Sequence, residues 1–142
     1  MNVGTDIIEV ARIEKIIKEK GDKFLNRIYT KYEINYCESK GLNKYQHYAG
    51  RFAAKEAIFK AIDVWYDKDY EASLKLKEIE IRGFGGVPAI GAMRYPVKFK
   101  APLPIYVSIS HTKEYATATA IATNANVDYA YIEGDWGDGV EK

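Results

Sequence analysis

The sequence predicts an α+β fold, in which N-terminal helices, including one long central helix, pack on an antiparallel sheet formed by the second half. Apolar residues recur at helical spacing through residues 10–63 and alternate with polar ones, as in half-buried strands, over much of residues 79–123. With 142 residues and no linker, the chain has the length of one domain. We therefore expect a single domain at residues 1–123 and an acidic, flexible tail at residues 124–142.

The chain opens with a predicted strand at residues 3–8 that runs directly into a helix. Apolar residues recur at helical spacing from Val10 onward, and Gly21 marks the end of this helix. Asp6 is therefore expected close to a strand-to-helix junction.

Two short helices and a long one follow. The first covers residues 23–28, and the second begins at Thr30, where the side chains of Thr30 and Glu33 can cap each other. Gly41 is expected to close this second helix. From residue 43 a helical pattern without proline continues to residues 61–63, which makes it the long central helix.

The second half reads as short strands separated by turns. After a strand that begins near residue 79, glycine and proline mark a turn, and strands are expected at residues 89–93 and 97–100. Residues 105–110 and 115–123 form a predicted hairpin with a four-residue connection. Small residues on one face of the last strand predict close packing against a helix or another subunit: Ala116, Ala118, Ala120 and Ala122.

The composition is that of an ordinary globular protein. Hydrophobic residues make up 47% and charged residues 29% of the chain, which argues against disordered, fibrous and membrane classes. No apolar stretch reaches the roughly 18 residues needed to cross a bilayer. Residues 1–15 lack the pattern of a secretory signal, and the single cysteine, Cys37, cannot form an internal disulfide. We therefore expect a cytoplasmic protein without membrane attachment.

Charge is distributed unevenly along the chain. Residues 128–142 hold five acids and one base, whereas basic residues gather between Arg12 and Lys31. An acidic protein, an anionic surface or nucleic acid could dock on this basic stretch, and the alternative is a solvated helix face. Within the tail, residues 127–132 could add an edge strand.

Glu56 is the most informative residue of the long helix. At about 100° per residue it lies in the middle of an apolar stripe that includes Phe52 and Phe59. A carboxylate in such a stripe is costly unless a cation meets it. Lys60, one turn further on, could form a helix ion pair with Glu56, and the alternative is a metal or phosphate site.

Asp6 could supply the second half of such a site. A carboxylate beside a helix start commonly points into a cleft, although helix capping would also explain it. Two carboxylates without histidine or thiol partners are hard oxygen ligands, which suit Mg²⁺ completed by water and substrate phosphates. Zinc is disfavoured because the whole chain contains only two histidines and one cysteine.

Four further residues are candidates for binding substrate phosphates. Ser110 and His111 stand at the end of a predicted strand, while Arg51 and Lys55 lie one turn apart on the long helix. Hydroxyl, imidazole and basic groups can all hold phosphate oxygens. The alternatives are an ordinary strand end with a surface histidine and two solvated basic side chains.

Three blocks of this sequence, in their order and spacing, resemble the stand-alone holo-acyl-carrier-protein synthase type of 4'-phosphopantetheinyl transferase. The resemblance extends over roughly residues 3–122 and implies the α+β fold of that family. The blocks are Gly4-Thr5-Asp6-Ile7-Ile8-Glu9 leading to Arg12-Ile13-Glu14, then Gly50-Arg51-Phe52-Ala53-Ala54-Lys55-Glu56-Ala57 with Lys60-Ala61, and Val107-Ser108-Ile109-Ser110-His111-Thr112.

The resemblance implies transfer of the 4'-phosphopantetheine group of coenzyme A to a serine of an apo acyl carrier protein, with Mg²⁺ as cofactor and adenosine 3',5'-bisphosphate as the released product. It also implies a homotrimer with active sites between subunits. The implied roles are Mg²⁺ binding by Asp6 and Glu56, catalysis by these two residues and by Lys60, which contacts the phosphates, binding of the nucleotide end by Arg51, Ser110 and His111, and contact with acidic residues of the carrier protein by Arg12.

Some features leave alternatives open. Glu56, directly or through water, is favoured over Asp6 as acceptor of the serine proton. Residues 62–67 replace the glycine-rich turn of the family, and Val87 replaces a charged residue, which bears on nucleotide contacts. Rival hypotheses are a non-catalytic module that binds nucleic acid or an acidic protein, and a Mg²⁺-dependent hydrolase of another nucleotide pyrophosphate. The carrier protein could serve fatty-acid or polyketide synthesis.

Overall fold

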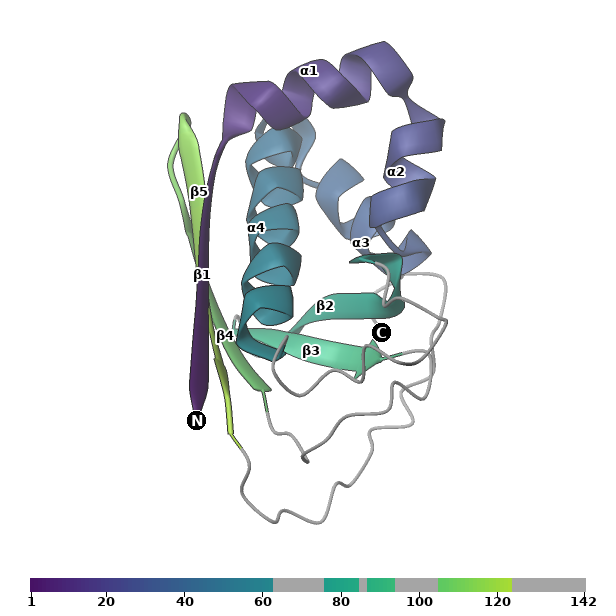
Figure 1. Ribbon diagram of the computed structural model, residues 1–142. Helices are drawn as coiled ribbons and strands as arrows, with labels where there is room; N and C mark the ends of the chain where they lie inside the picture. Colours follow the sequence, from purple (N-terminus) through teal and green to yellow (C-terminus); the bar gives the residue numbers. More distant parts are fainter. Residues whose placement is uncertain (63–75, 85–86, 94–104, 124–142) are drawn as a thin grey trace.

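The structure is a computed structural model that describes residues 1–62, 76–84, 87–93 and 105–123. Its centre is one long helix packed against a three-stranded antiparallel sheet, as Figure 1 shows. The helix is α4 (Lys44–Ile62), and the strands in spatial order are β1 (Asn2–Glu9), β5 (Tyr115–Ala122) and β4 (Ile105–His111). The predicted α+β fold with a long central helix is confirmed.

Three shorter helices precede α4: α1 (Val10–Lys20), α2 (Asp22–Ile28) and α3 (Lys31–Glu38). α1 continues directly from β1, as predicted, and ends at Gly21, whose φ of 56° favours glycine. Thr30 and Glu33 form the predicted capping box at the start of α3. The prediction that Gly41 closes this helix was wrong by a few residues, because a bond from Lys40 N to Cys37 O already tightens the chain before η1 (Gly41–Asn43).

The described strands form two sheets. β2 (Ile79–Phe84) and β3 (Val87–Met93) pair antiparallel after the short turn η3 (Leu76–Glu78). The predicted hairpin is β4–β5, and its connection has three residues rather than four because His111 still pairs with Ala116. The predicted strands at residues 97–100 and 127–132 and the predicted tail lie outside the described residues.

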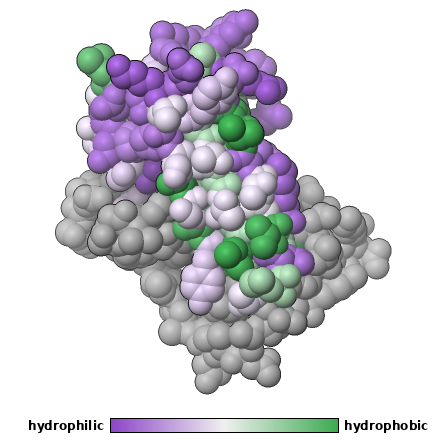
Figure 2. Space-filling view, turned by 90° about the vertical axis from the view of Figure 1, so that its left-hand side faces the viewer, coloured by the Kyte–Doolittle hydropathy of each residue, from purple (hydrophilic) through white to green (hydrophobic). Residues whose placement is uncertain are grey.

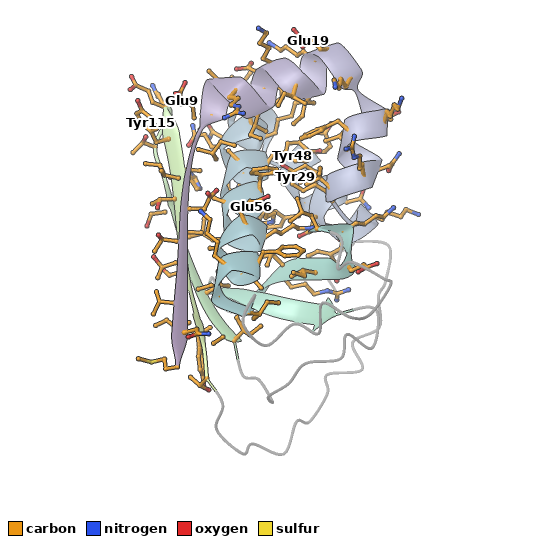
Figure 3. The ribbon with its side chains drawn as sticks, viewed as in Figure 1. Glu9, Glu19, Tyr29, Tyr48, Glu56 and Tyr115 are labelled. Atoms are coloured by element: carbon orange, nitrogen blue, oxygen red, sulfur yellow. The ribbon has the colours of Figure 1, made fainter. Side chains whose placement is uncertain are left out.

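Small residues bring α4 close to the sheet. The four predicted alanines of β5 are buried: Ala118, Ala120 and Ala122 lie in one hydrophobic cluster with α4 and β2, and Ala116 lies in a second cluster that also includes residues of α4. This confirms the predicted packing against a helix. A second cluster lies beneath α1 and α2, where Tyr29 and Tyr48 meet in Figure 3. At Gly4 of β1, a Cβ would stand 1.9 Å from the carbonyl oxygen of Ala57. Only glycine fits at this contact.

We expect Gly4→Ala to lower the free energy of unfolding by about 3 kcal/mol, the upper end of the usual cost of overpacking, because the new methyl group meets backbone. Gly50→Ala is the matched control, since a Cβ there would stand 3.0 Å from Cγ2 of Ile109, a side chain that can shift. Urea titration of both variants checks this. Equal stability of the two variants would contradict the close approach of β1 and α4.

A buried ion pair links α4 to the elements on its other side. Lys55 and Glu33 are both fully buried, with Lys55 Nζ 2.5 Å from Glu33 Oε1. Lys55 Nζ also donates to the carbonyl oxygens of Ile28, at 2.8 Å, and Leu76, at 3.1 Å. Glu33 in turn accepts from the backbone nitrogens of Thr30, at 2.8 Å, and Ile81, at 2.9 Å. One lysine and one glutamate therefore join α2, α3, η3 and β2 to α4.

Among the described residues, no helix combines the length and the apolar character that a bilayer crossing requires.

Candidate active site

Three residues predicted from the sequence, Asp6, Glu56 and Lys60, converge between β1 and α4. Residue alternation along β1 turns Asp6 toward α4 and leaves Thr5 and Ile7 exposed on the opposite face. Lys60 Nζ lies 3.2 Å from Asp6 Oδ1 and donates to the carbonyl oxygen of Thr5 at 2.8 Å. Glu56 lies one turn before Lys60 on α4, about midway along the helix in Figure 3.

The electrostatics of Glu56 show that the two carboxylates act on each other. Burial raises the pKa of Glu56, the negative charge of Asp6 raises it further, and Lys60 acts in the opposite direction. Two carboxylates held together in a partly buried site favour a bound cation, because a cation removes their mutual repulsion.

The donor set fits Mg²⁺. No group of three or more carboxylate, imidazole or thiol side chains that could hold a metal ion occurs within the described parts of the chain. The carboxylates of Asp6 and Glu56 can provide two hard oxygen ligands, and the remaining positions would go to water and to substrate oxygens. That arrangement is typical of Mg²⁺ at sites that handle phosphates.

A cleft of about 400 Å³ opens beside the two carboxylates. Arg12 of α1, a predicted carrier-binding residue, lines it and is exposed to solvent. The walls beyond are apolar and come from α1, α2 and α4: Ile13, Ile16, Phe24 and Phe52. The cleft thus combines a polar end with an apolar body, which suits a ligand that carries both kinds of group.

Arg51 and His111, two of the predicted substrate-binding residues, lie on another side of α4. Arg51 precedes Glu56 by five residues, which corresponds to a rotation of about 140° around the helix. The guanidinium carbon of Arg51 lies 3.8 Å from the ring centre of Tyr36. Within one chain, the structure therefore does not bring Arg51 to the carboxylates.

Ser110 and His111 point to opposite faces of β4. Ile109 and His111 both approach Gly50 of α4, whereas Ser108 and Ser110 are exposed on the other face of the strand. Ser110 is thus separated from Arg51 within a single chain, although the two residues were predicted to act together.

The predicted role of Lys55 was wrong. This residue was expected to bind substrate phosphates, but its side chain is fully buried and its ammonium group is used within the protein, as described above. Lys55 and Arg51 lie one turn apart on α4, and this spacing suggested a shared exposed face. The residues that cover Lys55 come from α3 and η3, which are distant in sequence, so the helical spacing could not reveal its burial.

Two residues that contact His111 were not among the predicted site residues: Gln46 and His47. Gln46 Oε1 lies 3.0 Å from His111 Nδ1, and the ring of His47 packs on the ring of His111 with centroids 4.9 Å apart. One signal was present in the sequence, since His47 precedes the candidate Arg51 by four residues and therefore lies on the same helix face.

Comparison with known proteins identifies the class. A sequence profile described as the 4'-phosphopantetheinyl transferase superfamily matches residues 2–120. The chain therefore belongs to this superfamily, and it is an enzyme of the phosphopantetheinyl transferase class.

Its relatives are of one particular type. The chain is 44% identical over 124 residues to the holo-[acyl-carrier-protein] synthase of Chlamydia muridarum, covering 87% of this chain and 95% of the relative. It is 43% identical over 125 residues to the synthase of the same name from Ruminiclostridium cellulolyticum, covering 85% and 90%. The resemblance recognised in the sequence is confirmed.

Solved structures agree with this assignment. The holo-(acyl-carrier-protein) synthase of Bacillus anthracis, in complex with CoA (3',5'-ADP), is 35% identical with a TM-score of 0.66, covering 87% of this chain and 96% of that one. The Helicobacter pylori synthase, in complex with coenzyme A, is 30% identical with a TM-score of 0.65, covering 85% and 99%.

Proposed function

We propose that this enzyme transfers the 4'-phosphopantetheine group of coenzyme A to a serine of an apo acyl carrier protein in the cytoplasm, in a Mg²⁺-dependent reaction that releases adenosine 3',5'-bisphosphate. The observation that carries the proposal is the convergence of Asp6, Glu56 and Lys60 beside one cleft. The names of the relatives and the coenzyme A complexes of the solved neighbours support it.

Each of the three side chains has a role in this proposal. Asp6 and Glu56 would hold Mg²⁺, which would supply positive charge at the diphosphate of coenzyme A. The serine hydroxyl of the carrier attacks the β-phosphate and gives its proton to Glu56, directly or through water. The bond between the two phosphates breaks, and its electron pair leaves with the 3',5'-bisphosphate. The ammonium group of Lys60 offsets that negative charge.

The direct test is to incubate the protein with coenzyme A, Mg²⁺ and an apo carrier protein and to weigh the carrier by mass spectrometry. We expect the carrier to gain one phosphopantetheine group and the reaction to stop when Mg²⁺ is chelated. Consumption of coenzyme A without a carrier would instead favour hydrolysis of the pyrophosphate, and no consumption at all would refute the proposal.

The Mg²⁺ requirement should depend on pH. Protons compete with the metal for Glu56, and they do so at higher pH than for an ordinary glutamate because the pKa of Glu56 is raised. We therefore expect the Mg²⁺ concentration for half-maximal rate to increase as pH falls through this raised pKa. Rate measurements over a range of Mg²⁺ concentrations at several acidic pH values, compared with pH 7.5, check this, and a constant requirement would contradict metal binding by Glu56.

Arg12 is proposed to contact acidic residues of the carrier protein. For Arg12→Glu we expect the KM for the carrier to rise by about tenfold or more, while the KM for coenzyme A stays unchanged. The reason is that the attraction between Arg12 and an acidic residue of the carrier would become a repulsion between two negative charges. Lys113→Glu is the control, since Lys113 is also exposed, lies outside the basic stretch between Arg12 and Lys31 and does not line the cleft. Steady-state kinetics with each substrate varied in turn separate the two effects, and an unchanged carrier KM would refute the assignment.

A homotrimer is the third part of the proposal. The outer face of the three-stranded sheet, turned to the viewer in Figure 2, exposes large apolar side chains from all three strands: Val3, Ile7, Tyr106 and Tyr115. Ser110 is exposed on the same face, and Arg51 lies away from Glu56 within one chain. Association through this face would bury the apolar side chains and could unite the separated groups. Light scattering should give the mass of three chains, and an active monomer would contradict this.

A further inference from the structure

The only two histidines of the chain lie against each other. His47 of α4 and His111 of β4 make an edge-to-face ring contact with centroids 4.9 Å apart. The ring of His47 also contacts the ring of Tyr36, at 5.6 Å. The guanidinium of Arg51 stacks on the ring of Tyr36. His47 therefore lies between His111 and the Tyr36–Arg51 pair.

The side chain of Arg51, next to Tyr36, has a hydrogen-bond donor without a partner among the described residues. Its side chain is almost completely buried, with 6% of the residue exposed, and its Nε–H has no hydrogen-bond partner among the described residues. A buried charged donor without a partner is costly, so such a group is commonly kept for a ligand. Arg51 Nε thus marks a position where an anion would be bound.

The groups that surround His47 are positive or neutral. Lys40, between α3 and η1, lies with Nζ 4.5 Å from the Tyr36 ring centre, and its charge, like that of Arg51 and that of His111 when protonated, acts on His47. Burial, followed by these positive charges, lowers the pKa of His47 to about 4. Burial and Arg51 also lower the pKa of His111. Both rings are therefore neutral near pH 7 in the ligand-free protein.

The hydrogen bond to Gln46 defines what the neutral His111 can offer. In the tautomer that donates from Nδ1 to Gln46 Oε1, 3.0 Å away, Nε2 carries a lone pair. A lone pair repels a phosphate oxygen, whereas a protonated Nε2 donates to it. A phosphate dianion bound here would stabilise the imidazolium form, because a nearby opposite charge raises the pKa of histidine.

We propose that His47 is an additional phosphate-binding residue of this enzyme, and that the pair of His47 and His111, beside the guanidinium of Arg51, takes up a proton when a phosphate monoester binds. This inference rests on the proposed function and names the phosphate monoester of adenosine 3',5'-bisphosphate as the ligand group. A dianionic monoester supplies the two negative charges that the cluster lacks, and the neighbouring Lys40 strengthens the positive potential.

The test is calorimetric titration of the protein with adenosine 3',5'-bisphosphate in two buffers that differ in ionisation enthalpy, which gives the number of protons taken up. Between pH 7 and 8 the ligand itself stays mostly dianionic, because the second pKa of a phosphate monoester is about 6. In this range we expect wild-type affinity to fall with rising pH, at most about tenfold per unit for each proton linked to binding.

His47→Phe is the decisive variant, because it keeps an aromatic ring against His111 and Tyr36 and removes only the titrating group. We expect it to fold normally by circular dichroism, to bind the bisphosphate more weakly at pH 7, and to take up fewer protons than wild type. A role of His47 limited to packing would leave the proton uptake unchanged.

The outcomes separate the two proposals. Binding of the bisphosphate with the same proton uptake in wild type and His47→Phe would overturn the inference and leave the proposed function standing. Failure of the wild-type protein to bind the bisphosphate at all would overturn the inference and count against the proposed function as well.

Discussion

Glu56→Gln is expected to lower the rate of Mg²⁺-dependent transfer by at least about 100-fold, the smallest effect usually assigned to a general base. The amide is a weaker metal ligand than the carboxylate and cannot accept the serine proton, so two contributions are lost together. Stability should be unchanged or slightly higher, because the substitution removes a partly buried charge that Asp6 repels. Single-turnover kinetics with an apo carrier and thermal unfolding measure the two quantities.

Glu19→Gln is the matched control for this variant. The same carboxylate-to-amide change is made there on an exposed residue of α1, away from Glu56 in Figure 3 and outside the cleft. Transfer by the Glu19→Gln protein should equal that of wild type. Full activity of Glu56→Gln would refute the assigned role, and Asp6→Asn should resemble Glu56→Gln in both measurements.

Lys55→Met is expected to reduce the free energy of unfolding by about 3–5 kcal/mol, the usual cost of removing one partner of a buried ion pair. The carboxylate of Glu33 would remain fully buried without its cation, and the carbonyl oxygens of Ile28 and Leu76 would lose a donor. Urea unfolding followed by circular dichroism measures this change. A loss below about 1 kcal/mol would contradict the importance of the pair.

The matched control is Lys44→Met, which breaks an ion pair at the surface. Lys44 Nζ lies 3.4 Å from Glu38 Oε1, and both side chains are partly exposed. Exposed pairs contribute at most about 1 kcal/mol, so this variant should be close to wild type. The difference between the two lysine variants isolates the effect of burial.

Much of the fold could be predicted because its signals are local. The capping box of Thr30 and Glu33 and the end of α1 at Gly21 each depend on residues that are close in sequence. The same holds for Glu56, because helical spacing alone places it among apolar residues. These features could be inferred before any long-range contact was known.

The surroundings of α4 could not be predicted in the same way. A helical wheel indicates which residues share a face, but it does not indicate what covers that face. Lys55 was expected at a solvent-exposed phosphate site, yet α3 and η3 enclose it. The contact of His47 with His111 likewise depends on how β4 docks against α4, which no spacing within either element reveals.

The placement of β1 has a consequence for how the protein folds. Asn2 pairs with Ala122, so β1, the first of the described strands, acquires this neighbour only after nearly all of the described chain has been synthesised. Helices α1 to α4 can form earlier, since the hydrogen bonds within a helix are local, whereas pairing over such a separation is slow. Asp6 would therefore reach Lys60 late, and we expect catalytic competence to be among the last properties that a nascent chain acquires.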